Sequence, residues 1–212
     1  LRILNQGYRM TGVVNSNACY NYHGSGGLRN WIRSSTDRPS EIRPLDIVRS
    51  VRFGNVIMST GPFLTVALEA QAPSNRPRGI PGDDVHAPGG KAALHARVQC
   101  PNWITVDRVQ VLFNGLAVED LNFTRATHPQ HFSDGVQQFD RRIPLHLPVD
   151  THVITLVRGH GPNLRHRRDA KDTTTQHIAM SNPVWVDVDG NGFKPHSPLD
   201  DEVYTFLDIL KP

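Results

Sequence analysis

Alternation of apolar and polar positions is the dominant pattern between residues 61 and 190. It is clearest from Ile104 to Phe113, where one slip in the alternation predicts a β-bulge. Asn114-Gly115 follows directly and is the strongest hairpin signal in the chain, so residues 116–118 are expected to return as the partner strand. Further strands are expected at 55–59, 63–69, 91–100, 139–147, 152–157 and 178–188, with a Pro/Gly-rich loop at 71–90.

Several short strands separated by turn signals predict a mainly β fold, an Ig-like antiparallel β-sandwich over residues 61–190. The apolar positions of these strands give the expected core: Ile104, Val106, Val109, Val111, Leu145, Leu147, Ile154, Leu156 and Trp185.

Residues 1–60 have a different, mixed α/β pattern. Leu1 and Leu4 precede Gly7 as the end of a helix would precede its glycine stop. A short buried strand is expected at 12–15, another strand at 28–33, and a helix from Pro44 to Gly54. Residues 191–212 are expected to form a tail with a short helix at 200–210.

Composition and charge narrow the possible functions. The 212 residues carry 23 basic and 20 acidic side chains, and this small excess does not indicate nucleic acid by itself. The basic cluster from Arg158 to Lys171 contains no aromatic residue for base stacking, so a solvated loop is favoured.

No apolar run is long enough to cross a membrane. Cys19 and Cys100 are expected to be free thiols in different modules.

The most informative stretch follows the expected strand at 12–15. It ends in a run of potential ligands that includes Asn17, Cys19 and His23. In barrel enzymes the strand ends point into the active site, and an Asp-x-His pair placed there binds a metal because alternate residues face the same side.

This stretch resembles the last metal-binding motif of PHP-type (polymerase and histidinol phosphatase) metallohydrolases, in the carbaryl-hydrolase-like CehA/McbA branch. That branch has roughly Asn-Ser/Thr-Asp-Ala-His here. Patches in the same order as the family's follow at 28–31, 57–64 and 181–190. The resemblance implies that residues 1–60 are the C-terminal end of a PHP-type (β/α) barrel: a strand-loop-strand-helix remnant. It also implies a parent metal-dependent hydrolase that uses zinc or manganese on a small-molecule ester, amide or phosphoester.

The departures from the family motif bear on activity. Asn17 stands where the family has Asp and Cys19 where it has His, and the family's upstream metal motifs are absent from this chain. A hydrolytic site takes three or more protein ligands and an open position for water. We therefore expect a degenerate site, no metal bound to this chain, no catalytic residue within it, and an N-terminal barrel portion as its missing partner. The first residue is Leu1 rather than Met, so we also expect a piece of a longer protein, whose localisation is left open.

Three further residues are candidates for contact with a substrate. His23 could be a ligand, a substrate contact or an ordinary loop histidine. Arg29 and Arg33 share one strand face and could hold an anionic group or simply face solvent.

The turn at 187–192 and the whole chain each have an alternative interpretation. Asp187 to Gly192 imitates the first half of an EF-hand loop, but Pro198 occupies the twelfth position, so a tight turn is favoured over a weak Ca²⁺ contact. The alternative to a hydrolase region is a non-catalytic Ig-like module that binds protein, glycan or nucleic acid.

Overall fold

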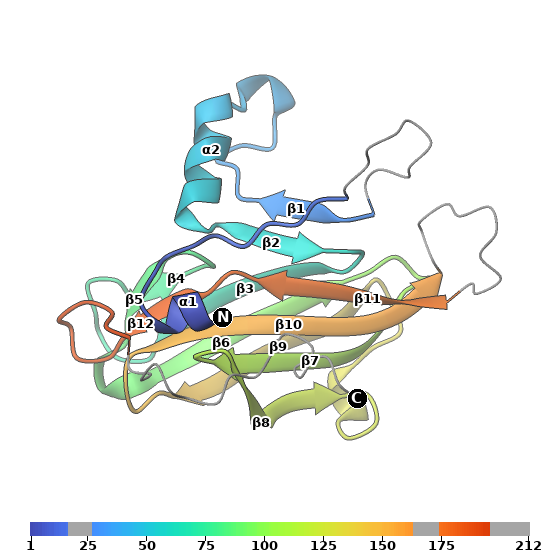
Figure 1. The fold of residues 1–212 in the computed structure, drawn as a ribbon. Coiled ribbons are helices and arrows are strands. Elements are labelled where there is room, and N and C mark those ends of the chain that lie inside the picture. The colour runs from blue at the N-terminus through green and yellow to red at the C-terminus, as the bar shows by residue number, and fades with distance from the viewer. Residues whose placement is uncertain (17–26, 163–173, 196–212) are drawn as a thin grey trace.

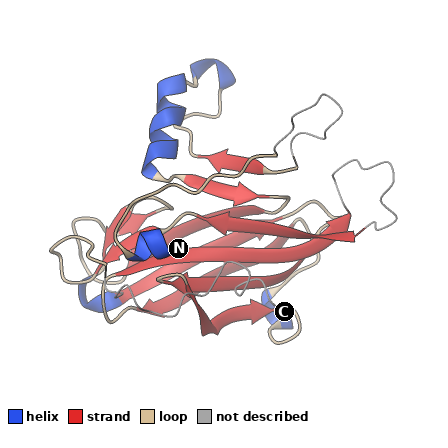
Figure 2. Ribbon diagram, in the orientation of Figure 1, coloured by secondary structure: helices blue, strands red, loops and turns tan. Residues whose placement is uncertain are grey.

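The computed structural model describes residues 1–16, 27–162 and 174–195. Within them the chain is mainly β and forms two sheets (Figures 1 and 2). The larger sheet, here called sheet A, contains β1 (Arg29–Ile32), β2 (Val56–Ser59), β5 (Asp84–His86), β7 (Thr105–Phe113), β8 (Leu116–Thr124), β10 (Thr151–Pro162), β11 (Thr174–Ser181) and β12 (Val184–Asp187).

The smaller sheet, sheet B, has the order β4-β3-β6-β9. Its strands are β3 (Phe63–Ala70), β4 (Arg78–Gly79), β6 (Lys91–Gln99) and β9 (Gln137–His146). The helices among the described residues are short: α1 (Arg2–Asn5), α2 (Pro44–Phe53) and three 3₁₀ turns at Pro39–Glu41, Pro88–Gly90 and Pro129–His131. No helix of this described part is long and apolar enough to span a bilayer.

The two sheets share one hydrophobic core. Inward-facing residues alternate along the strands, as in β6, where Ala92, Leu94, Ala96 and Val98 are all fully buried. Sheet A closes the core from the other side with Val106, Val109, Val111, Val153 and Val157. All nine residues expected in the core are buried, but Ile154, Leu156 and Trp185 do not belong to the cluster between the sheets. Trp185 instead packs beside His152, with Arg9 over its ring.

A second, smaller cluster accounts for Ile154 and Leu156. They pack with Leu112 on the outer face of sheet A, where Leu1 and Leu4 of the α1 region cover them. Sheet A is thus buried on both faces along β10, in which residues 151–157 are all buried.

The β7–β8 hairpin forms as the sequence predicts. Phe113 pairs with Leu116, and Asn114 and Gly115 both have positive φ, 51° and 83°, as a type I′ turn requires. β8 extends six residues beyond the expected 116–118, to Thr124. The predicted bulge in β7 is confirmed opposite β10, where the register shifts between Arg158 and Gly159.

α2 and its termination are also confirmed. Pro44 occupies the first turn, and Gly54 caps the helix in the left-handed region, with φ 82°. β1 pairs with β2, and β2 pairs with β11, so these elements extend sheet A beyond the main body (Figure 1). We call β1 and α2 together the appendage.

Several expectations are wrong. The expected strand at 12–15 does not form, and the Val13 side chain is 56% exposed rather than buried. The loop expected at 71–90 contains two short strands, because β4 pairs with β3 and β5 pairs with β12. β5 runs parallel to β12, so the fold is not wholly antiparallel. Arg158 and His160 of the expected basic loop belong to β10. The helix expected at 200–210 lies outside the described residues.

Candidate functional site

The degenerate motif itself lies outside the described residues, since Asn17, Cys19 and His23 all fall in 17–26. The segment that leads to it is held by two asparagine side chains. The Asn30 side-chain nitrogen donates to the Val14 carbonyl at 2.8 Å, and the Asn30 side-chain oxygen accepts from the Val14 N–H at 2.9 Å. Asn182 brackets Gly12 in the same way, at 2.7 and 3.0 Å. Side-chain amides thus replace the strand pairing that the sequence suggested for this segment.

Arg29 begins β1 and Arg33 follows its last residue, and the structure separates their surroundings. Arg33 lines a cleft of about 570 Å³ between the appendage and sheet B, whereas Arg29 does not line it. We call this hollow the arginine cleft and define it by its principal lining residues: Trp31, Arg33, Phe63, Arg78, Ile80 and Arg97.

The arginine cleft was missed by sequence reasoning except at Arg33. Arg97 belongs to the polar side of β6, and Arg78 comes from β4, opposite Glu69. The alternation of β6 identifies Arg97 as outward-facing, which is a usable signal. It does not reveal that β1 folds back beside this face, because that contact depends on the path of the chain between sheets.

An acidic cluster lies where β12 ends. Ligand oxygens of Asp150, Asp187 and Asp189 all lie within 4.8 Å of one another. The Asp187 carboxylate accepts the N–H groups of Gly190 and Gly192, at 2.7 and 2.9 Å. Asp150 accepts two further backbone N–H groups at 2.8 Å, and Asp189 accepts from Asn191 at 3.1 Å. The cluster therefore organises the tight turn expected here, and its oxygens already have donors.

The pKa of Asp187 reflects this arrangement. Burial is the largest single influence and would raise it, but the N–H groups of Gly192 and Gly190, the charge of His86 and the Asp189 side chain together outweigh burial, so the pKa is lowered from its ordinary value. The carboxylate form is thus the one that the turn stabilises.

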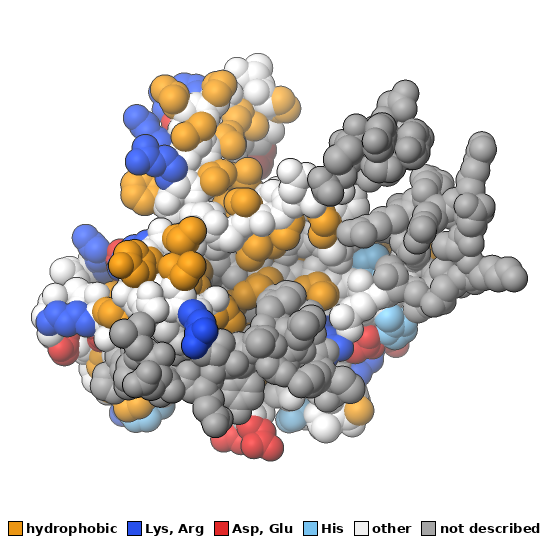
Figure 3. Space-filling model, in the orientation of Figure 1, with side chains coloured by type: hydrophobic (Ala, Val, Ile, Leu, Met, Phe, Trp, Pro, Cys, Tyr) orange, Lys and Arg blue, Asp and Glu red, His pale blue; other side chains and the backbone are white. Residues whose placement is uncertain are grey.

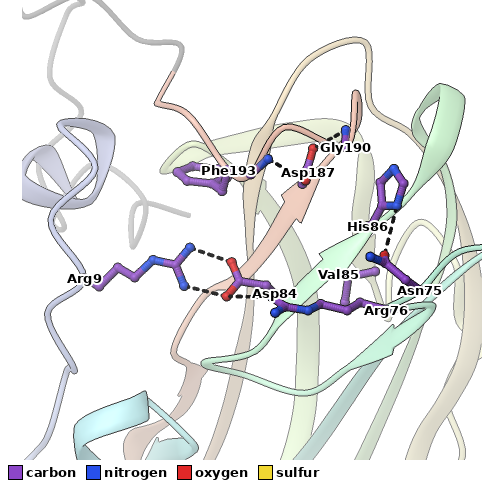
Figure 4. A pocket seen from close by; sticks show the side chains of 10 residues that line it. Arg9, Asn75, Arg76, Asp84, Val85, His86, Asp187, Gly190 and Phe193 are labelled. Atoms are coloured by element: carbon purple, nitrogen blue, oxygen red, sulfur yellow. Dashed lines mark hydrogen bonds and ion pairs between the residues drawn. The ribbon is translucent and has the colours of Figure 1, made fainter.

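Beside this turn is a polar hollow of about 470 Å³ (Figure 4). Arg9 crosses it to bind the Asp84 carboxylate with two nitrogens, at 2.9 and 2.5 Å, and lies over the Trp185 ring at 4.9 Å. His86 contacts the Asn75 amide oxygen at 3.3 Å. The charges of this hollow are largely paired within it, so it fixes the N-terminal segment against β5 and β12.

Two buried groups have strongly shifted pKa values. Burial raises the pKa of the Cys100 thiol to about 12, so Cys100 is a neutral core residue rather than a nucleophile. Burial also lowers the pKa of His152 to about 4. The His152 ring is fully buried beside Trp185, and neither ring nitrogen has a hydrogen-bond partner in the described part of the chain.

Comparisons with protein-family models, with curated proteins and with solved structures found no match to this chain.

Proposed function

We propose that this chain is the C-terminal region of a metal-dependent hydrolase. Residues 1–60 would complete a PHP-type (β/α) barrel whose other strands come from a separate N-terminal portion. The two sheets would form an Ig-like sandwich beside that barrel and help to enclose the substrate, a small ester, amide or phosphoester. Metal-activated water would attack the substrate.

The observation that carries the proposal is the exposed apolar surface of the appendage. α2 contains no buried residue, and Leu45, Val48 and Phe53 are 67%, 50% and 69% exposed. A helix with such a stripe usually packs it against another element. β1 is the last strand of sheet A and pairs only with β2 among the described strands, a position at which a further strand could be added. Hydrophobic side chains over α2 are visible in Figure 3.

The residues of this chain do not fit a complete hydrolytic metal site. Asn17 offers a neutral carbonyl and Cys19 one thiolate, without the carboxylate and imidazole of the family motif. Zinc or manganese would be held mainly by the N-terminal portion. We assign no catalytic step to this chain, and we expect it to be inactive in isolation.

The test is reconstitution with the N-terminal portion encoded upstream. The portion should contain a His-x-His motif at a strand end, and it should bind this chain during size-exclusion chromatography. Hydrolysis of a chromogenic ester or phosphodiester should require the N-terminal portion. Leu45→Lys combined with Val48→Lys should weaken the association at least about tenfold, because it places two charges in the apolar stripe.

Val136→Lys is the matched control, since Val136 is also exposed, at 60%, but lies outside the appendage. An upstream sequence without metal motifs would contradict the proposal and favour a non-catalytic binding module. Association that is equally strong in the double variant would contradict the role of α2.

A further inference from the structure

The arginine cleft combines an apolar wall with unneutralised guanidinium groups. We propose that it binds a small organic anion in which an aromatic body carries a carboxylate or phosphate group. Its volume of about 570 Å³ lies within the range of small-molecule sites. The inference concerns binding alone and does not depend on the proposed hydrolase function.

The apolar wall is formed by aromatic residues from different sheets. Trp31 of β1 meets Phe63 of β3 edge to face, with ring centroids 4.8 Å apart and ring planes at 76°. Trp31 is 39% exposed, so part of its indole remains available to a ligand. An aromatic body could pack against this pair at little conformational cost, since both rings are already positioned by their strands.

Of the arginines that line the cleft, Arg97 has its guanidinium group held most firmly by its surroundings. Its side chain is partly exposed, but its Nε is buried and has no hydrogen-bond partner among the described residues. The carboxylate directly across the strand pair is Asp140, which instead contacts His95 Nε2 at 2.6 Å. The guanidinium of Arg97 therefore keeps donors in a planar arrangement that matches a carboxylate or a phosphate.

The other charged groups around the cleft leave it positive. Arg33 is exposed and its guanidinium forms no ion pair within the described part of the chain. Arg78 pairs with Glu69 at 3.4 Å, but Glu69 is shared with Arg142 at 3.1 Å. Asp37 is the one carboxylate among the cleft-lining residues, which also include three arginines and His95. An anion would therefore be attracted and an organic cation repelled.

Arg33 also borders a second, polar hollow, which Asp46 lines as well. Asp46 nevertheless does not neutralise Arg33. Its carboxylate accepts two bonds from Arg43, at 2.7 and 3.0 Å, and lies 3.8 Å from Arg49. The positive charge of Arg33 thus remains available on the cleft side.

The test uses isothermal titration of the 212-residue chain with 1-naphthyl phosphate and 1-naphthoate. Neutral 1-naphthol, inorganic phosphate and a single-stranded oligonucleotide serve as comparison ligands. Both aryl anions should bind. Naphthol and inorganic phosphate should each bind at least about tenfold more weakly, because naphthol lacks the negative charge and inorganic phosphate lacks the aromatic body. Arg97→Gln and Arg33→Gln should each weaken binding of the aryl anions about tenfold or more.

Arg52→Gln is the matched control, since Arg52 is an exposed arginine of α2 that does not line the cleft, and it should leave binding unchanged. Thermal melting checks that each variant is folded. If Arg97→Gln unfolds the chain, Arg33→Gln decides the result, because Arg33 is exposed. Absence of aryl-anion binding, or binding that both arginine variants retain, would overturn the proposal. Equal binding of naphthol, or binding of the oligonucleotide alone, would also overturn it.

Discussion

Trp31 and Phe63 are in contact across the boundary between the appendage and sheet B, with their ring centroids 4.8 Å apart. Trp31 lies on the outermost strand of sheet A, and Phe63 begins the strand that follows the crossover into sheet B. This pair therefore links β1 to the main body in addition to the pairing of β1 with β2.

A double-mutant cycle measures this link. Trp31→Ala and Phe63→Ala should show a coupling energy of about 1 kcal/mol in chemical denaturation, because an aromatic pair contributes about that much beyond area burial. Leu116→Ala combined with Phe63→Ala serves as the control, since Leu116 lies at the exposed β7–β8 turn, and should show no coupling. Additive effects of the two aromatic substitutions would show that the contact does not stabilise the fold.

Local stability should differ between the appendage and the core. Amides of Val13–Asn15 and of α2 should exchange faster than those of Val109–Phe113, because α2 has no buried residue whereas β7 is central to the core. Hydrogen exchange followed by mass spectrometry checks this. Equal protection would mean that residues 1–54 have a complete core of their own, which would contradict the proposal of an incomplete barrel.

His152 should make stability fall in acid. Its pKa is about 4 in the folded chain against 6.5 for an ordinary histidine, so below pH 6.5 the unfolded state binds a proton that the folded state does not. At about 1.4 kcal/mol per pKa unit, the free energy of unfolding should decrease by ~3 kcal/mol as the pH falls from 6.5 to 4. Urea denaturation across this range measures the decrease.

His152→Leu should remove most of that dependence at little cost at neutral pH, because the ring makes no hydrogen bond within the described residues. His146→Gln is the control, since His146 is an exposed residue of β9, and should keep the dependence. An unchanged pH profile in His152→Leu would show that other groups cause the acid sensitivity.

Asp187 should contribute stability that is present at neutral pH and lost in acid. Its pKa is lowered in the folded state, so its contribution is complete above the ordinary carboxyl pKa and disappears as the pH falls through the lower folded value. Asp187→Asn should cost roughly 1–3 kcal/mol at pH 7, because the turn loses a charged acceptor of two N–H groups. Asp189→Asn should cost less, since Asp189 is exposed. Equal losses in the two variants would argue against this role.

Local sequence patterns predict the elements of this fold better than their arrangement. The alternation of β7, the Asn114-Gly115 turn and the Pro44–Gly54 helix depend on neighbouring residues, and all three are confirmed. The parallel pairing of β5 with β12 joins distant segments, and no local pattern specifies it. The segment at 12–14 has strand-like composition, but the amides of Asn30 and Asn182 take its backbone groups.

Part of the candidate site can likewise be identified from local sequence, and part requires the three-dimensional structure. Arg33 can be identified from the sequence because it ends an expected strand, 28–33, whose residues alternate. Its proximity to Arg97 depends on how β1 lies beside sheet B, and this requires the three-dimensional structure. The motif at Asn17 and Cys19 was recognised by resemblance and lies outside the described residues, so its role stays a prediction.

The metal content of the dialysed 212-residue chain tests the proposal of an incomplete hydrolase region most directly. We predict far less than one equivalent of zinc or manganese per chain, because Asn17, Cys19 and His23 supply no carboxylate and at most one thiolate and one imidazole. Asn17→Asp with Cys19→His should still bind metal weakly in this chain, and should raise metal content and hydrolysis in the protein extended by its N-terminal portion. Stoichiometric metal in the unaltered 212-residue chain, lost on Cys19→Ala, would contradict the account and make Cys19 a true ligand.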